Sequence, residues 1–265
     1  MPETTIDGLS LAYRDTGGPG RIVLLVHAFP FDGRMWDGQV ARFGDRQRLL
    51  VPDLPGFGDS SVPDDPAAYS IDAYADHLAA LLDDAGARDA VVCGVSMGGY
   101  VALALWRRHR ARVAALVLAD TRAGADTPEV ARRRAEQQET IHRDGITAVA
   151  DATLDRLLSE RAVARDAQLR ARTRALMEQP AAGYVGALEA MRTRHDATAD
   201  VAGVDAPALV IVGEDDVITP PDEARRLHEA IRGSQLVVIP AAGHLPNLEA
   251  PDEFDAALAG FLARL

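Results

Sequence analysis

The sequence predicts an α/β fold: a mostly parallel sheet flanked by helices, with a helical segment inserted between two of its strands. Three observations predict this class. Short runs rich in Val, Leu and Ile alternate with helical patterns over residues 22–118 and again over residues 208–265. Between them, residues 122–200 hold no strand-like run and are rich in Ala, Arg and Glu. At the end of the apolar run 90–95, one serine is flanked on each side by a glycine two residues away, a pattern typical of a tight turn.

Local patterns predict each element of the first half. Residues 4–14 predict a hairpin, because two short strand-like runs flank Asp7-Gly8, a favoured turn dipeptide. Helices are expected over residues 34–43 and 71–85, the second capped by Ser70. Continuous apolar runs are typical of strands buried on both faces of a parallel sheet. Four such strands are expected, over residues 22–26, 47–51, 90–94 and 113–118.

The second half resumes the alternation after the inserted segment. Strands are expected over residues 208–212 and 235–239, and helices over residues 222–231 and 251–265. The inserted segment differs in charge as well as in pattern. Residues 122–200 contain 13 arginines and 13 acidic residues, so the remainder carries the whole net charge of −12. We therefore expect an eight-stranded core built from residues 1–121 and 201–265, and a helical cap of residues 122–200.

Composition excludes several classes of function. The net charge of −12 argues against nucleic-acid binding, which needs clustered cations. All 28 cationic residues are arginine, so Schiff-base chemistry, covalent pyridoxal phosphate and a P-loop lysine are excluded. The single Cys93 allows no intramolecular disulfide and fits a reducing compartment. No apolar run approaches the ~18 residues of a membrane span, and the start lacks a leader pattern. We expect a soluble, cytoplasmic protein that needs no cofactor and no metal.

The stretch Gly94-Val95-Ser96-Met97-Gly98 has the spacing of a nucleophile elbow. Neither glycine carries a Cβ, so strand and helix can approach closely at the turn. The serine between them is expected in a strained backbone conformation that projects its hydroxyl from the sheet, and such strain persists mainly at functional sites.

A serine hydroxyl is a weak nucleophile unless a base removes its proton and a carboxylate orients that base. After Ser96, the chain offers an acidic pair, Asp215 and Asp216, and then His244, each just past a strand. Serine, acid and histidine in this order are typical of this type of elbow. Asp120, which also follows a strand, is a further candidate for the acid. His27 precedes the serine and is expected to organise its loop.

The chain resembles the α/β-hydrolases over nearly its full length. The motifs that carry this resemblance are His27-Ala28-Phe29-Pro30, residues 53–60, the elbow, Gly213-Glu214-Asp215-Asp216 with Thr219-Pro220, and Gly243-His244. The resemblance implies Ser96 as nucleophile, Asp216 as acid and His244 as base, with Asp215 and Asp120 as alternatives to Asp216. It also implies an oxyanion hole formed by the N–H groups of Phe29 and Met97. The family usually has His-Gly where this chain has His27-Ala28, and alanine adopts a positive φ less readily than glycine.

Finer resemblance points to bacterial esterases close to the 3-oxoadipate enol-lactonases, through residues 27–36, 118–122 and 179–184. We expect a serine hydrolase that cleaves an ester or lactone of a small, largely apolar substrate. Two alternatives stay open: a cofactor-free perhydrolase with the same residues, and a ligand-binding signalling protein on a hydrolase scaffold. Neither membrane nor nucleic acid is an expected partner, and a homo-oligomer is allowed. The residues expected to line an apolar pocket between the core and the cap are Phe29, Phe31, Met35, Trp36, Met97, Met177, Tyr184 and Met191. The cations considered for substrate carboxylates are Arg122, Arg192 and Arg194.

Overall fold

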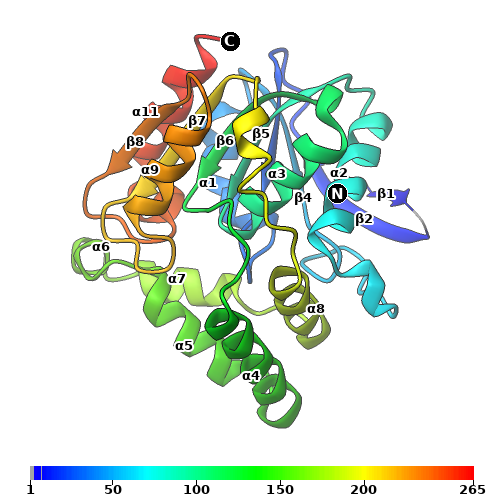
Figure 1. The fold of residues 1–265 in the computed structure, drawn as a ribbon, viewed down its shortest axis with the longest axis vertical. Helices are drawn as coiled ribbons and strands as arrows, with labels where there is room; N and C mark the ends of the chain where they lie inside the picture. Colours follow the sequence, from blue (N-terminus) through cyan, green and yellow to red (C-terminus); the bar gives the residue numbers. More distant parts are fainter. Residues whose placement is uncertain (1–2, 7) are drawn as a thin grey trace.

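In the computed structural model, which describes residues 3–6 and 8–265, eight strands form one sheet in the order β1-β2-β4-β3-β5-β6-β7-β8 (Figure 1). β1 and β2 form an antiparallel hairpin, β2 lies antiparallel to β4, and all other neighbours are parallel. The predicted sheet is therefore confirmed, while Asp7 of the predicted hairpin turn lies outside the described residues. The strands are β1 Glu3–Ile6, β2 Leu9–Asp15, β3 Ile22–Val26, β4 Arg48–Pro52, β5 Ala90–Val95, β6 Val113–Ala119, β7 Ala208–Gly213 and β8 Gln235–Ile239.

The central strands form where the apolar runs predicted them. Every residue of β5 and of β7 is buried, because helices cover both faces of the sheet at its centre. β8 lies at the edge, and there Val238 is exposed to solvent. The ends of the strands differ from the predicted ends by no more than a residue or two.

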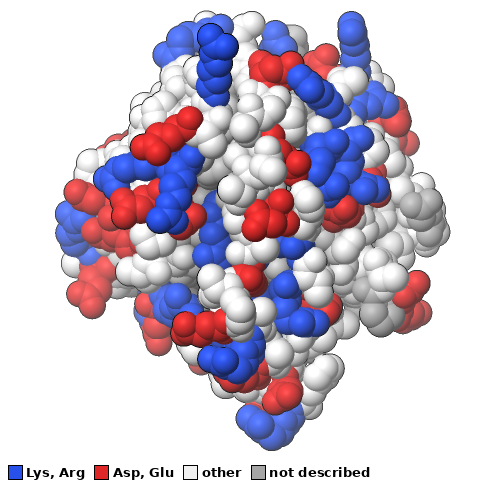
Figure 2. All heavy atoms as spheres, viewed as in Figure 1, with Lys and Arg blue, Asp and Glu red and all other residues white. Residues whose placement is uncertain are grey.

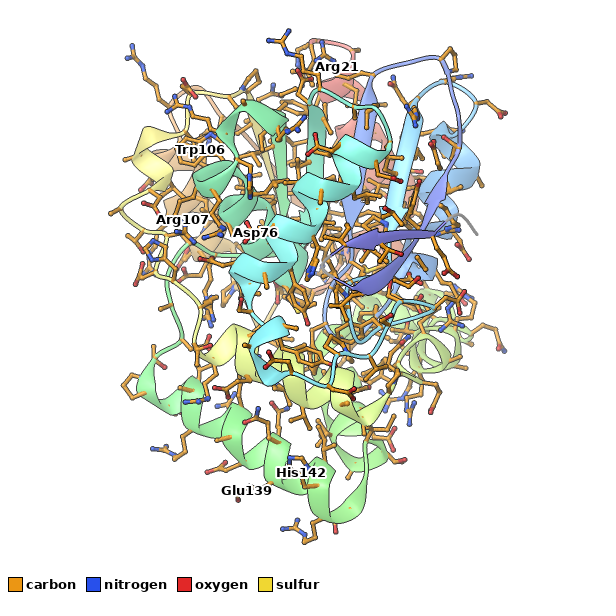
Figure 3. All side chains as sticks on the ribbon, turned by 90° about the vertical axis from the view of Figure 1, so that its right-hand side faces the viewer. Arg21, Asp76, Trp106, Arg107, Glu139 and His142 are labelled. Atoms are coloured by element: carbon orange, nitrogen blue, oxygen red, sulfur yellow. The ribbon has the colours of Figure 1, made fainter. Side chains whose placement is uncertain are left out.

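Helices cover both faces of this sheet. α2 packs on α3, and α3 packs against β5 and β6. On the opposite face α1 contacts α11, where the Gln39 amide donates to the Asp255 carboxylate at 2.9 Å. Figure 3 shows α2 and α3 in front of the sheet and α11 behind it. The helices of the core are α1 Asp37–Phe43, α2 Ile71–Asp84, α3 Met97–Arg108, α9 Pro221–Ala230, α10 Pro246–Glu249 and α11 Pro251–Leu262.

Two helix boundaries differ from the prediction by more than one residue. In place of one helix over residues 34–43, a 3-10 turn over Gly33–Trp36 precedes α1, because the Asp32 carboxylate accepts the Arg34 N–H and caps that turn. α11 ends at Leu262, three residues before the expected end. The Ser70 cap of α2 is confirmed, since its Oγ accepts the Ala73 N–H at 2.9 Å. Further 3-10 turns span Pro66–Ala68, Arg110–Arg112 and Val201–Gly203.

All the regular secondary structure between β6 and β7 is helical. Its helices lie beyond the carboxyl ends of the strands, below the sheet in Figure 1. Arginine and acidic side chains alternate over its surface (Figure 2), as the balanced charge of residues 122–200 predicts. No helix among the described residues is long and apolar enough to cross a membrane. The helices are α4 Pro128–Asp144, α5 Thr147–Leu157, α6 Glu160–Arg165, α7 Leu169–Leu176 and α8 Ala181–Arg192.

The junction of β5 and α3 is a closely packed turn of the core. A Cβ on Gly94 would overlap the carbonyl of Gly98, and a Cβ on Gly98 would overlap the carbonyl of Val26 on β3. Both overlaps involve backbone atoms, which cannot rotate away. The two glycines are therefore required by the approach of α3 to β5 and β3.

This packing predicts the effect of a methyl group. Replacement of Gly98 by Ala should lower the free energy of unfolding by about 1–3 kcal/mol, because backbone atoms must shift to admit the Cβ. The matched control is Gly38→Ala in α1, where nothing lies within 4 Å of the added Cβ. There the higher helix propensity of alanine should raise the free energy of unfolding by up to about 0.5 kcal/mol. Urea denaturation measures both changes, and equal stability of the two variants would contradict the proposed close packing.

Candidate active site

Ser96 occupies the turn between β5 and α3 in a strained conformation, with φ 54° and ψ −112°. The predicted elbow geometry is thereby confirmed, since a positive φ is uncommon for any residue but glycine. The turn is held by two hydrogen bonds from β6 and its end: the Ser96 N–H donates to the Ala119 carbonyl, and the Thr121 hydroxyl donates to the Ser96 carbonyl, both at 2.9 Å. The Ser96 hydroxyl does not cap α3. It is free to face the carboxyl edge of the sheet.

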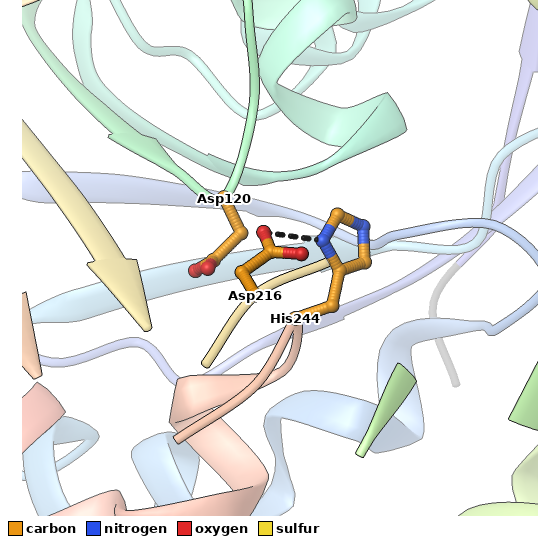
Figure 4. Close-up of side chains that lie close together, drawn as sticks. All are labelled: Asp120, Asp216 and His244. Carbon is orange, nitrogen blue, oxygen red and sulfur yellow. Dashed lines mark hydrogen bonds and ion pairs between the residues drawn. The ribbon is translucent and has the colours of Figure 1, made fainter. Parts of the chain in front are cut away.

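A hydrogen-bonded chain joins Ser96, His244 and Asp216, which follow β5, β8 and β7. The Ser96 Oγ lies 2.7 Å from His244 Nε2, and His244 Nδ1 lies 2.8 Å from Asp216 Oδ2. Figure 4 shows the contact between the imidazole and the carboxylate. An Nδ1–H that donates to Asp216 leaves the Nε2 lone pair directed at the serine hydroxyl. This is the geometry in which a histidine can take the proton of a serine.

Asp216 is built to remain ionised. Its Oδ1 accepts the N–H groups of Ile218 and Thr219 at 2.7 and 3.1 Å, and its Oδ2 accepts the Thr219 hydroxyl at 2.6 Å. Burial acts to raise its pKa, but the neighbouring His244 and these hydrogen bonds outweigh burial and lower the pKa below its usual value.

The two alternative acids occupy different surroundings. Asp215 accepts hydrogen bonds from Ser159 and Arg161 and makes none to His244. Asp120 is fully buried beside Asp216, with no hydrogen bond to His244 (Figure 4). Of the three candidates, Asp216 is the one whose carboxylate bonds the imidazole.

Glu249 holds the loop that carries His244, a role that no sequence motif indicates. Its carboxylate accepts the N–H groups of Ser159, Gly243 and Leu245 at 2.7 to 2.9 Å. The His244 N–H donates to the carbonyl of Leu157 at the end of α5. The imidazole is therefore fixed both to the core and to the inserted segment.

The loop after β3 carries Phe29, whose N–H the sequence analysis predicts as the second oxyanion donor. No acceptor is found for the N–H of Phe29 or of Met97 among the described residues. Ala28 does not have a positive φ, so the glycine usual in the family is not needed here. His27 organises the loop: its Nε2 accepts the Leu54 N–H at 3.0 Å and its Nδ1 lies 3.0 Å from the Ala28 carbonyl. Burial lowers the pKa of His27 and keeps it neutral.

A cavity of about 340 Å³ opens over Ser96 and His244, between the core and helices α4, α5 and α8. Of the residues predicted for the pocket, Phe29 and Met191 line it, whereas Phe31, Trp36 and Tyr184 do not. All three are fully buried elsewhere: Trp36 packs on Phe254, and Tyr184 packs edge-on behind Phe29 while its hydroxyl bonds a carbonyl. The lining residues are Phe29, Ser96, Tyr100, Arg122, Val130, Arg133, Arg134, Gln137, Ala152, Thr153, Arg156, Leu157, Met191, Ile218 and His244.

Four arginines line this cavity, and only Arg122 was among the cations considered from the sequence. Arg122 and Arg134 both pair with the buried Asp126. Arg133 lies 3.4 Å from Glu129. Arg156, at the solvent-exposed rim, has no acidic partner within salt-bridge distance among the described residues. Partial burial and the charges of Arg133 and Arg134 lower its pKa, and the charge of Asp216 opposes them.

The other two cations considered from the sequence lie outside the cavity. Arg192 pairs with Glu189 on α8. Arg194 is buried, pairs with Asp126 and stacks over the ring of Tyr100 at 4.1 Å. Both are engaged within the protein, and neither is free to meet a substrate.

The fold and site together define an α/β-hydrolase. A family model described as alpha/beta hydrolase fold matches residues 21–251, and the chain belongs to this family. Its resemblance to enol-lactonase-like esterases is also confirmed. An esterase from Thermogutta terrifontis, solved with malate bound, is 39% identical with a TM-score of 0.93, over 99% of this chain and 96% of that chain.

Two further relatives act on lactones by name. The enol-lactonase of Burkholderia xenovorans LB400 is 32% identical with a TM-score of 0.90, over 99% of this chain and all of that chain (100%). A curated relative, 3-oxoadipate enol-lactonase 1 of Acinetobacter baylyi, is 29% identical over 232 residues, which are 87% of this chain and 84% of the relative. The chain is thus similar to hydrolases of esters and of lactones.

The acid can be tested by separate amide substitutions. We expect Asp216→Asn to lower kcat by about 10⁴, because an amide cannot hold the imidazole in its reactive tautomer or stabilise its charged form. Asp215→Asn is the matched control and should stay within about twofold, since it loses surface contacts only. Hydrolysis of p-nitrophenyl acetate by variants with an unchanged circular dichroism spectrum measures both. A near-wild-type rate for Asp216→Asn would refute the choice of acid.

Proposed function

We propose that the protein is a serine hydrolase that cleaves carboxylic esters or lactones through an acyl-enzyme on Ser96. The observation that carries this proposal is the 2.7 Å contact of Ser96 Oγ with His244 Nε2 at the floor of a cavity large enough for a small ester. The similarity to named esterases and lactonases supports the same class of reaction.

The proposed reaction has two halves. Ser96 Oγ attacks the substrate carbonyl as its proton passes to His244, and the oxyanion accepts hydrogen bonds from the N–H groups of Phe29 and Met97. His244 then returns the proton to the leaving alcohol oxygen as the carbon–oxygen bond breaks. In the second half, water attacks the acyl-serine with His244 again as base, and the acid is released. In a lactone the leaving oxygen stays attached to the acyl chain.

The substrate proposed here carries a carboxylate in addition to the reacting bond. Arg156 stands at the cavity rim beside Arg133, and no acidic side chain in the described part of the chain pairs with it, so an anionic group gains a charge-assisted hydrogen bond there. Apolar side chains such as Ile218, Met191 and Leu157 line the space between this rim and Ser96. The relative from T. terrifontis was solved with malate, itself a dicarboxylate, which supports the same preference.

The nucleophile is tested by Ser96→Ala. Hydrolysis of p-nitrophenyl acetate should fall by about 10⁴ or more, because the acyl-enzyme cannot form. Ser234→Ala is the matched control: Ser234 also lies 2.7 Å from a histidine, His228, but faces neither the cavity nor an acid. Mass spectrometry after reaction with an organophosphate should find the adduct on Ser96 alone.

Two outcomes would favour the alternative functions. Absence of any Ser96-dependent turnover on short esters and lactones would favour a signalling protein on a hydrolase scaffold. Peroxide-dependent bromination of monochlorodimedone that exceeds ester hydrolysis would favour a perhydrolase.

The anionic preference is tested by Arg156→Gln. On monomethyl glutarate we expect KM to rise about five- to tenfold, because one charge-assisted contact at an exposed rim is lost. Methyl valerate, which lacks the carboxylate, should be hydrolysed with unchanged KM. Arg170→Gln on the outer surface, where Arg170 pairs with Asp155, is the matched control. Equal effects of Arg156→Gln on both esters would contradict the preference, as would a KM difference that salt does not reduce.

A further inference from the structure

Asp120, the residue after β6, is a buried acid that the proposed reaction leaves without a role. It is fully buried and has a positive φ of 44°. Its Oδ1 accepts the Gly213 N–H at 2.9 Å, while its Oδ2 is buried with no hydrogen-bond donor among the described residues. Polar atoms of Asp120, Asp216 and His244 lie within 4.8 Å of one another (Figure 4).

Two buried carboxylates at this separation cannot both be ionised, because each destabilises the charge of the other. The donors around them decide which one holds the proton. Asp216 accepts four hydrogen bonds, from His244, from Ile218 and from both the N–H and the hydroxyl of Thr219. Asp120 accepts one, from Gly213. The negative charge is therefore stabilised on Asp216, and the proton belongs on Asp120.

We propose that Asp120 is a protonated positioning residue whose Oδ2–H donates to the carboxylate of Asp216 and fixes it against His244. No other residue in the described ranges gives Oδ2 a partner, and Asp216 is the neighbouring group whose negative charge can accept the hydrogen bond. Because Asp120 is neutral, it holds Asp216 in place without adding a second charge beside His244. The role in catalysis rests on the proposed function, whereas the protonated state does not.

The surrounding charges support this assignment. Burial raises the pKa of Asp120 well above its usual value, and the charges of Asp216 and Glu249 raise it further, against the single hydrogen bond from Gly213. His244 faces Asp216 on the opposite side, and Arg156 of α5 acts on Asp216 from the cavity. Glu249 accepts three backbone N–H groups. Within the described part of the chain, these are the titratable and charged groups that β7, β8, α5 and α10 place near Asp120 and Asp216.

The positive φ of Asp120 makes one substitution especially informative. Asparagine is among the residues that tolerate this conformation. Its amide can accept the Gly213 N–H and donate to Asp216, as a protonated carboxyl does. Asp120→Asn thus replaces one neutral donor by another, whereas Asp120→Ala removes the donor.

The protonated state is tested by infrared spectroscopy at neutral pH, which does not depend on activity. The difference spectrum of wild type minus Asp120→Asn should contain a carbonyl band of a protonated carboxylic acid. Glu249→Gln provides the control for a second buried acid. If this difference spectrum instead contains the bands of an ionised carboxylate, Asp120 is ionised in the wild type. That result would overturn the proposal, whatever the enzyme hydrolyses.

The positioning role is tested by kinetics on a substrate that wild type hydrolyses in a Ser96-dependent manner. For Asp120→Asn we expect kcat within about threefold of wild type and an unchanged acid limb in the pH profile of kcat/KM, because no charge beside His244 is removed. Asp120→Ala should lose about 10- to 100-fold in kcat, as when a hydrogen bond to a charged group is removed. An acid limb displaced by about one pH unit in Asp120→Asn would show that Asp120 is ionised and would overturn the proposal.

Discussion

The contact of α3 with β5 and β3 at Gly94 and Gly98 is the constraint on which the rest of the site depends. Because neither residue has a Cβ, α3 begins within one residue of the end of β5, and Ser96 is forced to a positive φ. Thr121 then ties the Ser96 carbonyl to the end of β6. The strain at the serine is supported by backbone packing and by this neighbouring strand, so the hydroxyl has a fixed position from which the other groups can be placed.

Four neighbouring strands supply the remaining groups in spatial order. β5, β6, β7 and β8 lie side by side, and Ser96, Asp120, Asp216 and His244 follow their ends. A separation of 148 residues between Ser96 and His244 thereby becomes a 2.7 Å contact. A parallel sheet presents all its carboxyl ends at one edge, and this is why residues distant in the chain converge there.

The sequence predicted the strands well and the pocket poorly, for a physical reason. A strand buried on both faces must be apolar throughout, so its pattern is local and its ends are readable to within a residue or two. An aromatic residue near a site can equally well pack in the core, as Trp36 and Tyr184 do. Arg156 is one of 13 arginines in residues 122–200. Whether such a side chain faces solvent or the cavity depends on how α4 and α5 pack over the sheet, which no local pattern encodes.

The charge of the cavity differs in sign from that of the whole chain. The chain carries −12, yet the wall over Ser96 is lined by four arginines. The buried Asp126 pairs with two of them, Arg122 and Arg134, and also with Arg194 behind the wall, so one carboxylate serves three guanidinium groups. The positive charge that Asp126 does not neutralise lies over the Asp216–His244 pair, which the core holds in place. All four of these arginines come from the inserted segment, residues 122–200, whereas Ser96, Asp216 and His244 come from the core. Under the proposed function, substitutions in the inserted segment can therefore change the choice of substrate while the reacting groups stay in place.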